Sequence, residues 1–114
     1  MVMKRGEIWW ASMGEPGGSE PGFRRPVVIV SSNEFNDSYI QTVICATITS
    51  NLRLAGAPGN FKITKSKSGL SKESVVNISQ IITLDKSFLT EQVSNLNNRQ
   101  LISLNEGLRL VLKL

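Results

Sequence analysis

The chain changes from loop to strand across a stretch that reads Gly18-Ser19-Glu20-Pro21-Gly22-Phe23-Arg24-Arg25-Pro26-Val27-Val28-Ile29-Val30. Glycine, proline and serine at this density predict a loop over 13–25. The apolar, β-branched residues after Pro26 predict a strand over about 26–32 that is buried on both faces. Pro26 fixes its own φ and favours an extended Arg25, so both arginines should stand at the mouth of a rigid sheet, where a guanidinium can bind an anion such as phosphate. The competing interpretation is that they are solvated loop charges.

Length and composition indicate one domain spanning residues 1–114, since 114 residues with 40% hydrophobic content suffice for a single core. No apolar run approaches the roughly 20 residues of a membrane helix. The start, Met-Val-Met-Lys-Arg-Gly-Glu, does not have the pattern of a signal peptide. The single cysteine, Cys45, permits no internal disulfide and fits a reducing compartment. We therefore expect a cytoplasmic protein without a membrane partner.

The charge pattern favours a polyanionic partner. The net charge is +4 and the isoelectric point about 9.6. A stretch without any acid carries five basic residues, Arg53, Lys62, Lys65, Lys67 and Lys72. With Lys4, Arg5, Arg24 and Arg25 these residues would form a basic face. Solvation alone is an equally ordinary role for lysines in a hairpin.

The absence of histidine excludes several kinds of active site. A chain with no histidine has no Ser-His-Asp or Cys-His device, no two-histidine ribonuclease centre and no histidine-ligated metal. The nine acids are scattered, without the paired spacing of a two-metal site. No glycine-rich phosphate loop ending in Lys-Ser/Thr is present. We expect neither a metal nor a cofactor.

The remaining elements follow from alternation and turn residues. Strands are predicted over 5–12, 41–49, 61–64, 74–84 and 91–93, the fourth being either one bent strand or two joined strands. Helical turns are predicted at 34–37 and 85–89, and loops or turns at 51–60 and 65–69. Of Trp9 and Trp10, one should lie in the core, while the other is free to stack at an interface or on a base. Cys45 is interpreted as a small buried apolar residue.

One long helical pattern closes the chain. Leu101, Leu104, Leu108 and Val111 recur on one helix face, and Asn97 with Gln100 predicts a polar cap. Gly107 should weaken this helix by about 1 kcal/mol relative to alanine. The fold class is therefore mainly β with α: a small, strongly curved sheet or partly open barrel followed by a C-terminal helix. Its edge strands make dimerisation plausible.

Several motifs of this chain, taken together, resemble motifs of the MazF/PemK toxin family that occur in the same order. The resemblance rests on Arg5-Gly6-Glu7-Ile8-Trp9, Gly18-Ser19-Glu20, Arg25 to Val30, Ala46 to Ser50, Ser74-Val75-Val76, Gln80-Ile81 and Thr83-Leu84-Asp85. Each motif is degenerate, whereas their order and spacing are specific and extend over essentially the whole chain. Two features depart from some relatives: the first loop has no histidine, and Arg24 adds a second arginine beside the family's Gly-x-Arg-Pro position.

The resemblance implies a homodimer with an SH3-like, CcdB-type barrel. It implies a metal-independent, sequence-specific endoribonuclease that cuts single-stranded RNA by 2′-hydroxyl attack, leaving a 2′,3′-cyclic phosphate and a 5′-hydroxyl, and so arrests translation. A cognate MazE-like antitoxin would cover the RNA groove, and operator DNA would be bound only through the complex of toxin and antitoxin.

The resemblance also assigns site residues. Arg25 would be the main catalytic arginine, for which charge stabilisation suits a guanidinium better than proton donation. Thr49 would hydrogen-bond a phosphate oxygen, with Thr47 and Ser50 as near alternatives. Glu20, the acid of the first loop, is the candidate base. The candidate RNA contacts, which read bases, stack on them or steer the backbone, are Ser19, Phe23, Arg24, Ser50, Lys62, Lys65, Lys67 and Gln80.

Two other functions stay open at this point. A small basic barrel without histidine or clustered acids can hold nucleic acid without cutting it. The same barrel can act as a protein-directed toxin that poisons gyrase as CcdB does, using the end of the C-terminal helix. The Arg-Pro loop motif argues against this second alternative.

Overall fold

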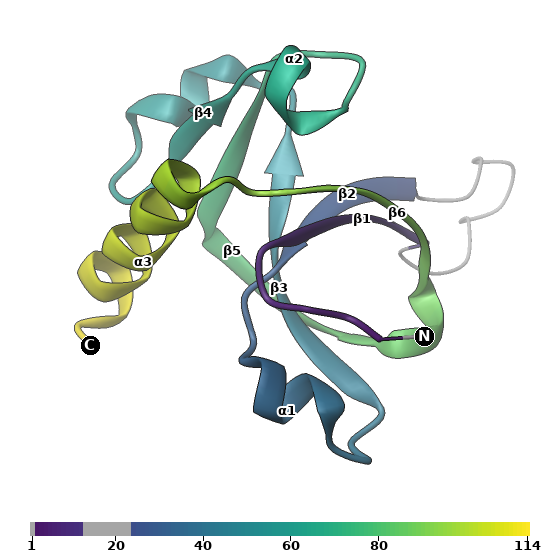
Figure 1. Cartoon of the computed structure of the whole chain (residues 1–114). Coiled ribbons are helices and arrows are strands. Elements are labelled where there is room, and N and C mark those ends of the chain that lie inside the picture. The colour runs from purple at the N-terminus through teal and green to yellow at the C-terminus, as the bar shows by residue number, and fades with distance from the viewer. Residues whose placement is uncertain (1, 13–23) are drawn as a thin grey trace, which may run out of the picture.

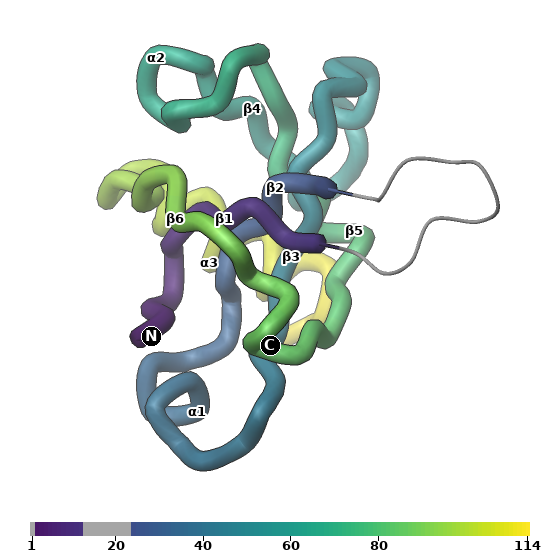
Figure 2. The backbone as a smooth tube through the Cα atoms, turned by 90° about the vertical axis from the view of Figure 1, so that its right-hand side faces the viewer, coloured from purple at the N-terminus to yellow at the C-terminus, as the bar shows by residue number. Residues whose placement is uncertain are grey.

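The computed structural model describes residues 2–12 and 24–114 of the chain. Its strands are β1 (Glu7–Ser12), β2 (Arg24–Ile29), β3 (Thr42–Thr49), β4 (Phe61–Ile63), β5 (Ser74–Asp85) and β6 (Leu89–Asn95). The α-helices are α1 (Asn33–Asp37), α2 (Lys65–Ser68) and α3 (Asn98–Leu112), and the 3-10 helices are η1 (Leu52–Gly56) and η2 (Lys86–Phe88). Figure 2 shows α1 and α2 at opposite ends of the molecule.

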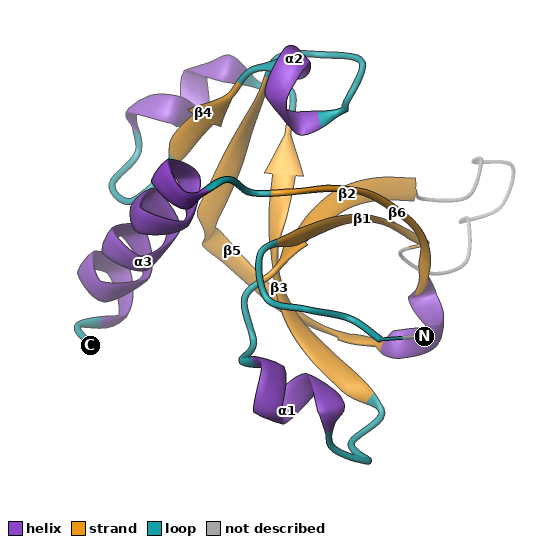
Figure 3. Ribbon diagram, in the orientation of Figure 1, coloured by secondary structure: helices purple, strands orange, loops and turns teal. Residues whose placement is uncertain are grey.

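The strands form one antiparallel sheet in the order β4-β5-β3-β2-β1-β6. The sheet curls, so that β1, β2 and β6 arch over one side of the molecule while β3 and β5 run along the other (Figure 1). Antiparallel strands twist, and a strongly twisted sheet of this size curls towards closure. The structure thus confirms a mainly β half-barrel with a C-terminal helix (Figure 3).

The bend of the sheet is made in β5, which is one bent strand. Ala46 of β3 lies opposite Ile81, whereas its neighbour Thr47 lies opposite Asn77, so residues 78–80 have no partner on β3. The side chain of Asn60 occupies the irregularity. It accepts a hydrogen bond from the Ile78 amide at 2.7 Å and donates one to Asn77 Oδ1 at 3.1 Å. These bonds satisfy backbone and amide groups that the missing ladder leaves over.

Alternation along the strands gives each face of the curled sheet its own core. One core lies on the side of α3 and joins Ile8, Val28, Ala46, Ile48, Ile63, Leu70, Val76, Ile78, Leu96, Leu104 and Leu108. The second core, inside the arch, joins Met3, Trp9, Ala11, Val27, Ile29, Val43, Cys45, Leu84 and Leu89. Trp9 is therefore the core tryptophan, and Trp10 is only partly buried.

The helix α3 begins at a complete capping box. Asn97 accepts from the Gln100 amide and Gln100 accepts from the Asn97 amide, each at 2.8 Å, which confirms the predicted cap. Leu104 and Leu108 are buried, while Val111 is 41% exposed. Gly107 has a packing role in addition to its predicted cost in helix propensity. A β-carbon at that position would overlap the carbonyl oxygen of Gly59, whose φ is +84°, so glycine lets the helix approach the turn closely.

Several sequence-based boundaries need correction. Arg24 and Arg25 do not end a loop; they belong to β2, where they lie opposite Ser12 and Ala11 of β1. Backbone pairing with β1 extends the strand on the N-terminal side of Pro26 and overrides the turn-rich composition. The last strand, predicted over 91–93, runs from Leu89 to Asn95 because all of it is close to β1. The predicted loop at 51–60 contains η1, which Asn51 caps.

Other local predictions are confirmed. Asp85 caps η2 by accepting from the amide and the hydroxyl of Ser87, and these bonds lower the pKa of Asp85. Cys45 is fully buried in β3. Within the described ranges, the helices are all too short or too polar to span a bilayer.

Candidate functional site

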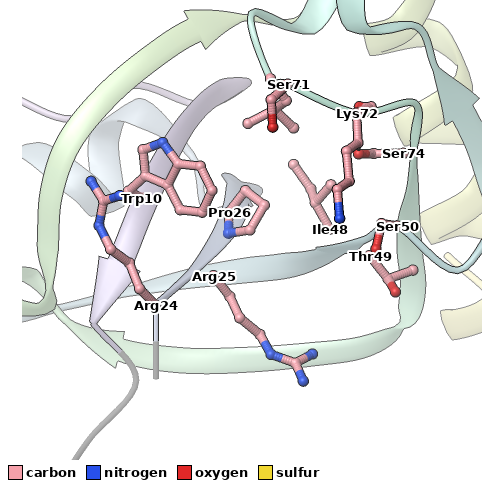
Figure 4. A pocket seen from close by; sticks show the side chains of 11 residues that line it. Trp10, Arg24, Arg25, Pro26, Ile48, Thr49, Ser50, Ser71, Lys72 and Ser74 are labelled. Atoms are coloured by element: carbon pink, nitrogen blue, oxygen red, sulfur yellow. The ribbon is translucent and has the colours of Figure 1, made fainter. Parts of the chain in front are cut away.

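A groove of about 410 Å³ lies where β1, β2 and β3 approach the segment that connects α2 to β5 (Figure 4). Its lining combines apolar floor residues, cations and hydroxyls. The lining residues in the described part of the chain are Trp10, Arg24, Arg25, Pro26, Ile48, Thr49, Ser50, Leu70, Ser71, Lys72 and Ser74. Of the predicted site residues, the groove therefore brings together Arg24, Arg25, Thr49 and Ser50.

The sheet register explains why Arg25 and Thr49 line the same groove, although the paired positions of β2 and β3 end at Val27 and Thr47. Val27 of β2 lies opposite Thr47 of β3, and continuing the same register by two residues sets Arg25 opposite Thr49. Both side chains then project from the same face of the sheet. Each is partly buried, so each is held by the sheet and still reaches solvent.

The Thr49 hydroxyl retains a proton to donate. Its oxygen accepts a hydrogen bond from the Asn51 amide at 3.1 Å, at the turn after β3. A hydroxyl that accepts from one side can donate from the other. The Thr49 hydroxyl can therefore donate to an acceptor in the groove.

Arg24 projects from the other face of β2 and is held differently. Its guanidinium carbon lies 4.5 Å from the centroid of the Trp10 ring, and its Nη2 lies 3.1 Å from a carboxylate oxygen of Glu91 on β6. Both partners of the ion pair are more than half exposed, so the pair contributes little to stability. Its effect is to keep Arg24 against Trp10 at the rim.

The sequence analysis missed the contribution of the segment before β5. Leu70, Ser71, Lys72 and Ser74 line the groove opposite Trp10 and Pro26. Figure 4 shows the Lys72 side chain directed towards Ile48 and Ser50. Lys72 was part of the acid-free basic stretch, which was its only sequence signal. The groove position depends on β5 pairing with β3, which composition does not show.

The other predicted lysines lie elsewhere. Lys62 and Lys67 line a second depression of about 240 Å³, together with Phe61, Thr64, Asn97, Arg99, Gln100 and Ser103. We call this the cationic hollow; it lies at the N-terminus of α3. Lys65 is exposed on α2 and lines neither depression among those described. The basic face that was expected to include Arg5 is interrupted, because Arg5 bonds Val30 O at 2.9 Å and Asn105 at 2.8 Å.

Gln80 does not line the groove in the described structure but lies beside the same strands. Its Oε1 accepts from the Thr47 hydroxyl at 2.8 Å, and Thr47 is buried two residues from Thr49 on the same face of β3. Thr47 is thereby committed, which leaves Thr49 as the strand-end hydroxyl in the groove. The predicted residues Ser19, Glu20 and Phe23, and the loop that carries them, lie outside the described residues.

Cys45 lies in the core on β3, outside the residues that line the groove. Burial raises the pKa of the Cys45 thiol to about 12, so this cysteine stays protonated and unreactive at neutral pH. Among residues 2–12 and 24–114, no cluster of three or more aspartate, glutamate or cysteine side chains is arranged to hold a metal ion. The described groove can offer an anion three cations and several hydroxyls.

Comparison with known proteins gives consistent matches over the full length. The family model described as "PemK-like, MazF-like toxin of type II toxin-antitoxin system" matches residues 4–112. Endoribonuclease MazF6 of Mycobacterium tuberculosis is 44% identical over 114 residues, covering all of both chains. Endoribonuclease MazF of Staphylococcus saprophyticus is 38% identical, covering 99% of this chain and 93% of the relative.

A solved structure supports the fold. The chain resembles the toxin in a crystal structure of MazE-MazF from Deinococcus radiodurans with a TM-score of 0.82, 22% identity and coverage of 100% of this chain and 98% of the other.

Proposed function

Because the chain belongs to the family of PemK-like, MazF-like toxins of type II toxin–antitoxin systems, we propose that it is an endoribonuclease toxin whose active centre is the Arg25–Thr49 groove. The observation that carries the proposal is that Arg25, near the start of β2, and Thr49, at the end of β3, line one groove together with other cations and hydroxyls. Its RNA substrate is single-stranded and is cut within specific sequences.

The proposed reaction uses the RNA's own nucleophile and no metal. The ribose 2′-oxygen forms a bond to phosphorus while the bond from phosphorus to the 5′-oxygen breaks. A base takes the 2′ proton, and an acid supplies a proton to the departing 5′-oxygen. The products are a 2′,3′-cyclic phosphate and a 5′-hydroxyl. The protein must hold the phosphate and stabilise the additional negative charge that forms on it.

Arg25 and Thr49 fit these two tasks. A guanidinium pairs with two phosphate oxygens at once, and Arg25 stands at the end of a paired strand, which keeps it oriented. Thr49 donates its hydroxyl proton to a phosphate oxygen while its oxygen accepts from the Asn51 amide. Glu20 is proposed as the base that removes the 2′ proton.

Further contacts would set affinity and sequence preference. Ser50 and Arg24 line the groove next to the proposed phosphate position, and Gln80 lies beside it through Thr47. Ser19 and Phe23 are proposed to contact RNA from the first loop. Lys62, Lys65 and Lys67 are exposed and would attract the RNA backbone at longer range.

RNA cutting would arrest translation, and a cognate MazE-like antitoxin would neutralise the protein by covering the groove. Structures of toxins bound to antitoxins are among those that the fold resembles.

We further propose a homodimer. The last turns of α3 expose two leucines, Leu110 (64%) and Leu112 (52%). Exposed apolar side chains at one helix end are typical of a surface that another protein chain covers. Sedimentation of the purified protein should give twice the chain mass, and Leu110→Glu should halve it; a monomeric wild type would exclude this proposal.

The function is tested by mapping RNA ends. The purified protein is incubated with mixed-sequence single-stranded RNA in EDTA, and the 5′ ends of the fragments are sequenced. Cuts at a recurring sequence, with 5′-hydroxyl and cyclic phosphate ends, are expected. RNA binding without products would identify a non-catalytic barrel, and loss of cutting in EDTA would contradict the metal-free reaction. Inhibition of gyrase supercoiling without RNA products would indicate a protein-directed toxin that poisons gyrase as CcdB does.

A further inference from the structure

The groove has two sides. Residues from one face of β1, β2 and β3 line one side, and residues from the other face line the second side. Trp10 lies opposite Pro26, and continuing the β2–β3 register sets Pro26 opposite Ile48. These three form a row across β1, β2 and β3. The adjacent row, on the opposite face, contains Arg25 and Thr49. Figure 4 shows the Arg25 side chain leading away from the Trp10 and Pro26 rings, so the Trp10 side of the groove is not occupied by the proposed catalytic pair.

The Trp10 side is built as a small apolar recess with a polar rim. Its walls are Trp10, Pro26, Ile48 and Leu70, of which Ile48 and Leu70 are buried. Arg24 lies over the Trp10 ring, 4.5 Å from its centroid, and pairs with Glu91 at the rim of the recess. The whole groove, at about 410 Å³, is within the range of about 300–1,000 Å³ that small-molecule sites occupy.

We propose that this recess is a base-binding subsite, in which Lys72 selects uracil or guanine, whose O4 or O6 carbonyl stands where cytosine and adenine carry an amino group. The proposal rests on the proposed function, since it places the base next to the phosphate that Arg25 and Thr49 hold. Apolar and aromatic walls cover the π-face of a nucleobase and so stabilise its transfer out of water, whichever base it is. The identity must then be read at the rim.

The rim offers donors to the base. The Ser74 hydroxyl already donates to the backbone carbonyl oxygen of Lys72 at 3.0 Å. The Lys72 ammonium has donors alone, and its side chain makes no hydrogen bond or ion pair with the described residues, in which it points towards Ile48 and Ser50. A lysine donates to O4 of uracil or O6 of guanine, whereas cytosine and adenine present an amino donor at the equivalent position. The recess therefore distinguishes a carbonyl edge from an amino edge.

The test exchanges donor for acceptor at the rim. Lys72→Glu is compared with Lys62→Glu, which makes the same charge change in the cationic hollow. Four sets of RNA vary one base at each position around the mapped cut, and relative cleavage is measured. Matching oligonucleotides with 2′-O-methyl groups, which lack the nucleophile, give binding without cutting.

At one position the wild type should favour uracil or guanine by about tenfold, and Lys72→Glu should shift that preference towards cytosine or adenine by a similar factor. Lys62→Glu should weaken all RNAs alike. Lys72→Gln, which has both donor and acceptor, should flatten the preference and serves if Lys72→Glu does not fold. Unchanged preference in both Lys72 variants of a wild type that cuts RNA overturns the subsite alone. A wild type that neither binds nor cuts any RNA overturns the proposed function, and the subsite with it.

Discussion

The groove and the cationic hollow both carry positive charge, but they hold it in different ways. In the groove, Arg25 projects from a strand that is hydrogen-bonded on β1, and it is partly buried. In the hollow, Lys62, Lys67 and Arg99 are exposed at the surface beside the N-terminus of α3. A long exposed side chain loses conformational entropy when it binds, whereas a side chain on a paired strand has lost part of it already. If the groove is the active centre, as proposed, we expect the groove cations to contribute more to RNA cutting than the equally charged cations of the hollow.

The largest expected difference is in the rate of RNA cutting. Arg25→Ala should lower it by about 100–1,000-fold, the effect of removing one preorganised donor to transition-state charge. Thr49→Ala should act in the same direction. The measurement is single-turnover cleavage of the mapped RNA, with thermal unfolding to show that the variants remain folded.

Lys67→Ala is the matched control in the hollow. It should change cutting only a few-fold, and the change should shrink as salt rises, because a mobile surface charge acts through the counterions of the RNA. If Lys67→Ala and Arg25→Ala proved equally harmful at moderate salt, the proposed contrast between the two regions would be wrong.

A smaller effect, on stability, concerns how α3, whose N-terminus borders the hollow, packs against the turn at Gly59. Gly107→Ala should destabilise the protein by about 1–3 kcal/mol, because the new methyl group overlaps Gly59 O and crowds Ile78 Cγ1 at 3.1 Å. This cost outweighs the better helix propensity of alanine, about 1 kcal/mol.

Gly56→Ala provides the control for Gly107→Ala, since nothing lies within 4 Å of a β-carbon there. Denaturant unfolding of both variants separates steric overlap from helix propensity. A Gly107→Ala protein as stable as wild type would mean that α3 can move away from the turn at no cost.

The smallest effect tests whether the sheet beneath the groove excludes water. Burial raises the pKa of Cys45 to about 12 from its ordinary value of 9.0. Between pH 9.0 and about 12, the folded protein keeps the thiol proton while the unfolded chain releases it. The contribution of the buried thiol to the free energy of unfolding is therefore complete below pH 9 and is lost as the pH rises from 9.0 towards 12. Unfolding free energy measured from pH 8 to 10.5 should fall less steeply in Cys45→Ala than in wild type. Parallel curves, or rapid alkylation of native Cys45, would contradict a dry interior.

The sequence predicts the elements of the sheet well because strand alternation and turn residues are local signals. The six strands, the cap at Asn97 and the burial of Cys45 all depend on such signals. Arg25 and Thr49 could be selected through the ordered motifs of a known family. Lys72 could not, because its place in the groove results from pairing between β3 and β5, which are separated by 24 residues of other structure. The boundary of β2 was also missed, since a partner strand, and not composition, decides where it begins.

The order of the strands has a consequence for how the protein is made. The sheet order places β6, which is among the last elements to be synthesised, next to β1, which is the first. The groove itself draws on residues 10, 24–26, 48–50, 70–72 and 74, so it cannot form before the start of β5 has been synthesised. Small domains fold as cooperative units once their long-range contacts are available. The groove should therefore form only after β5 has been synthesised and has paired with β3, and the pairing of β6 with β1 follows later in synthesis.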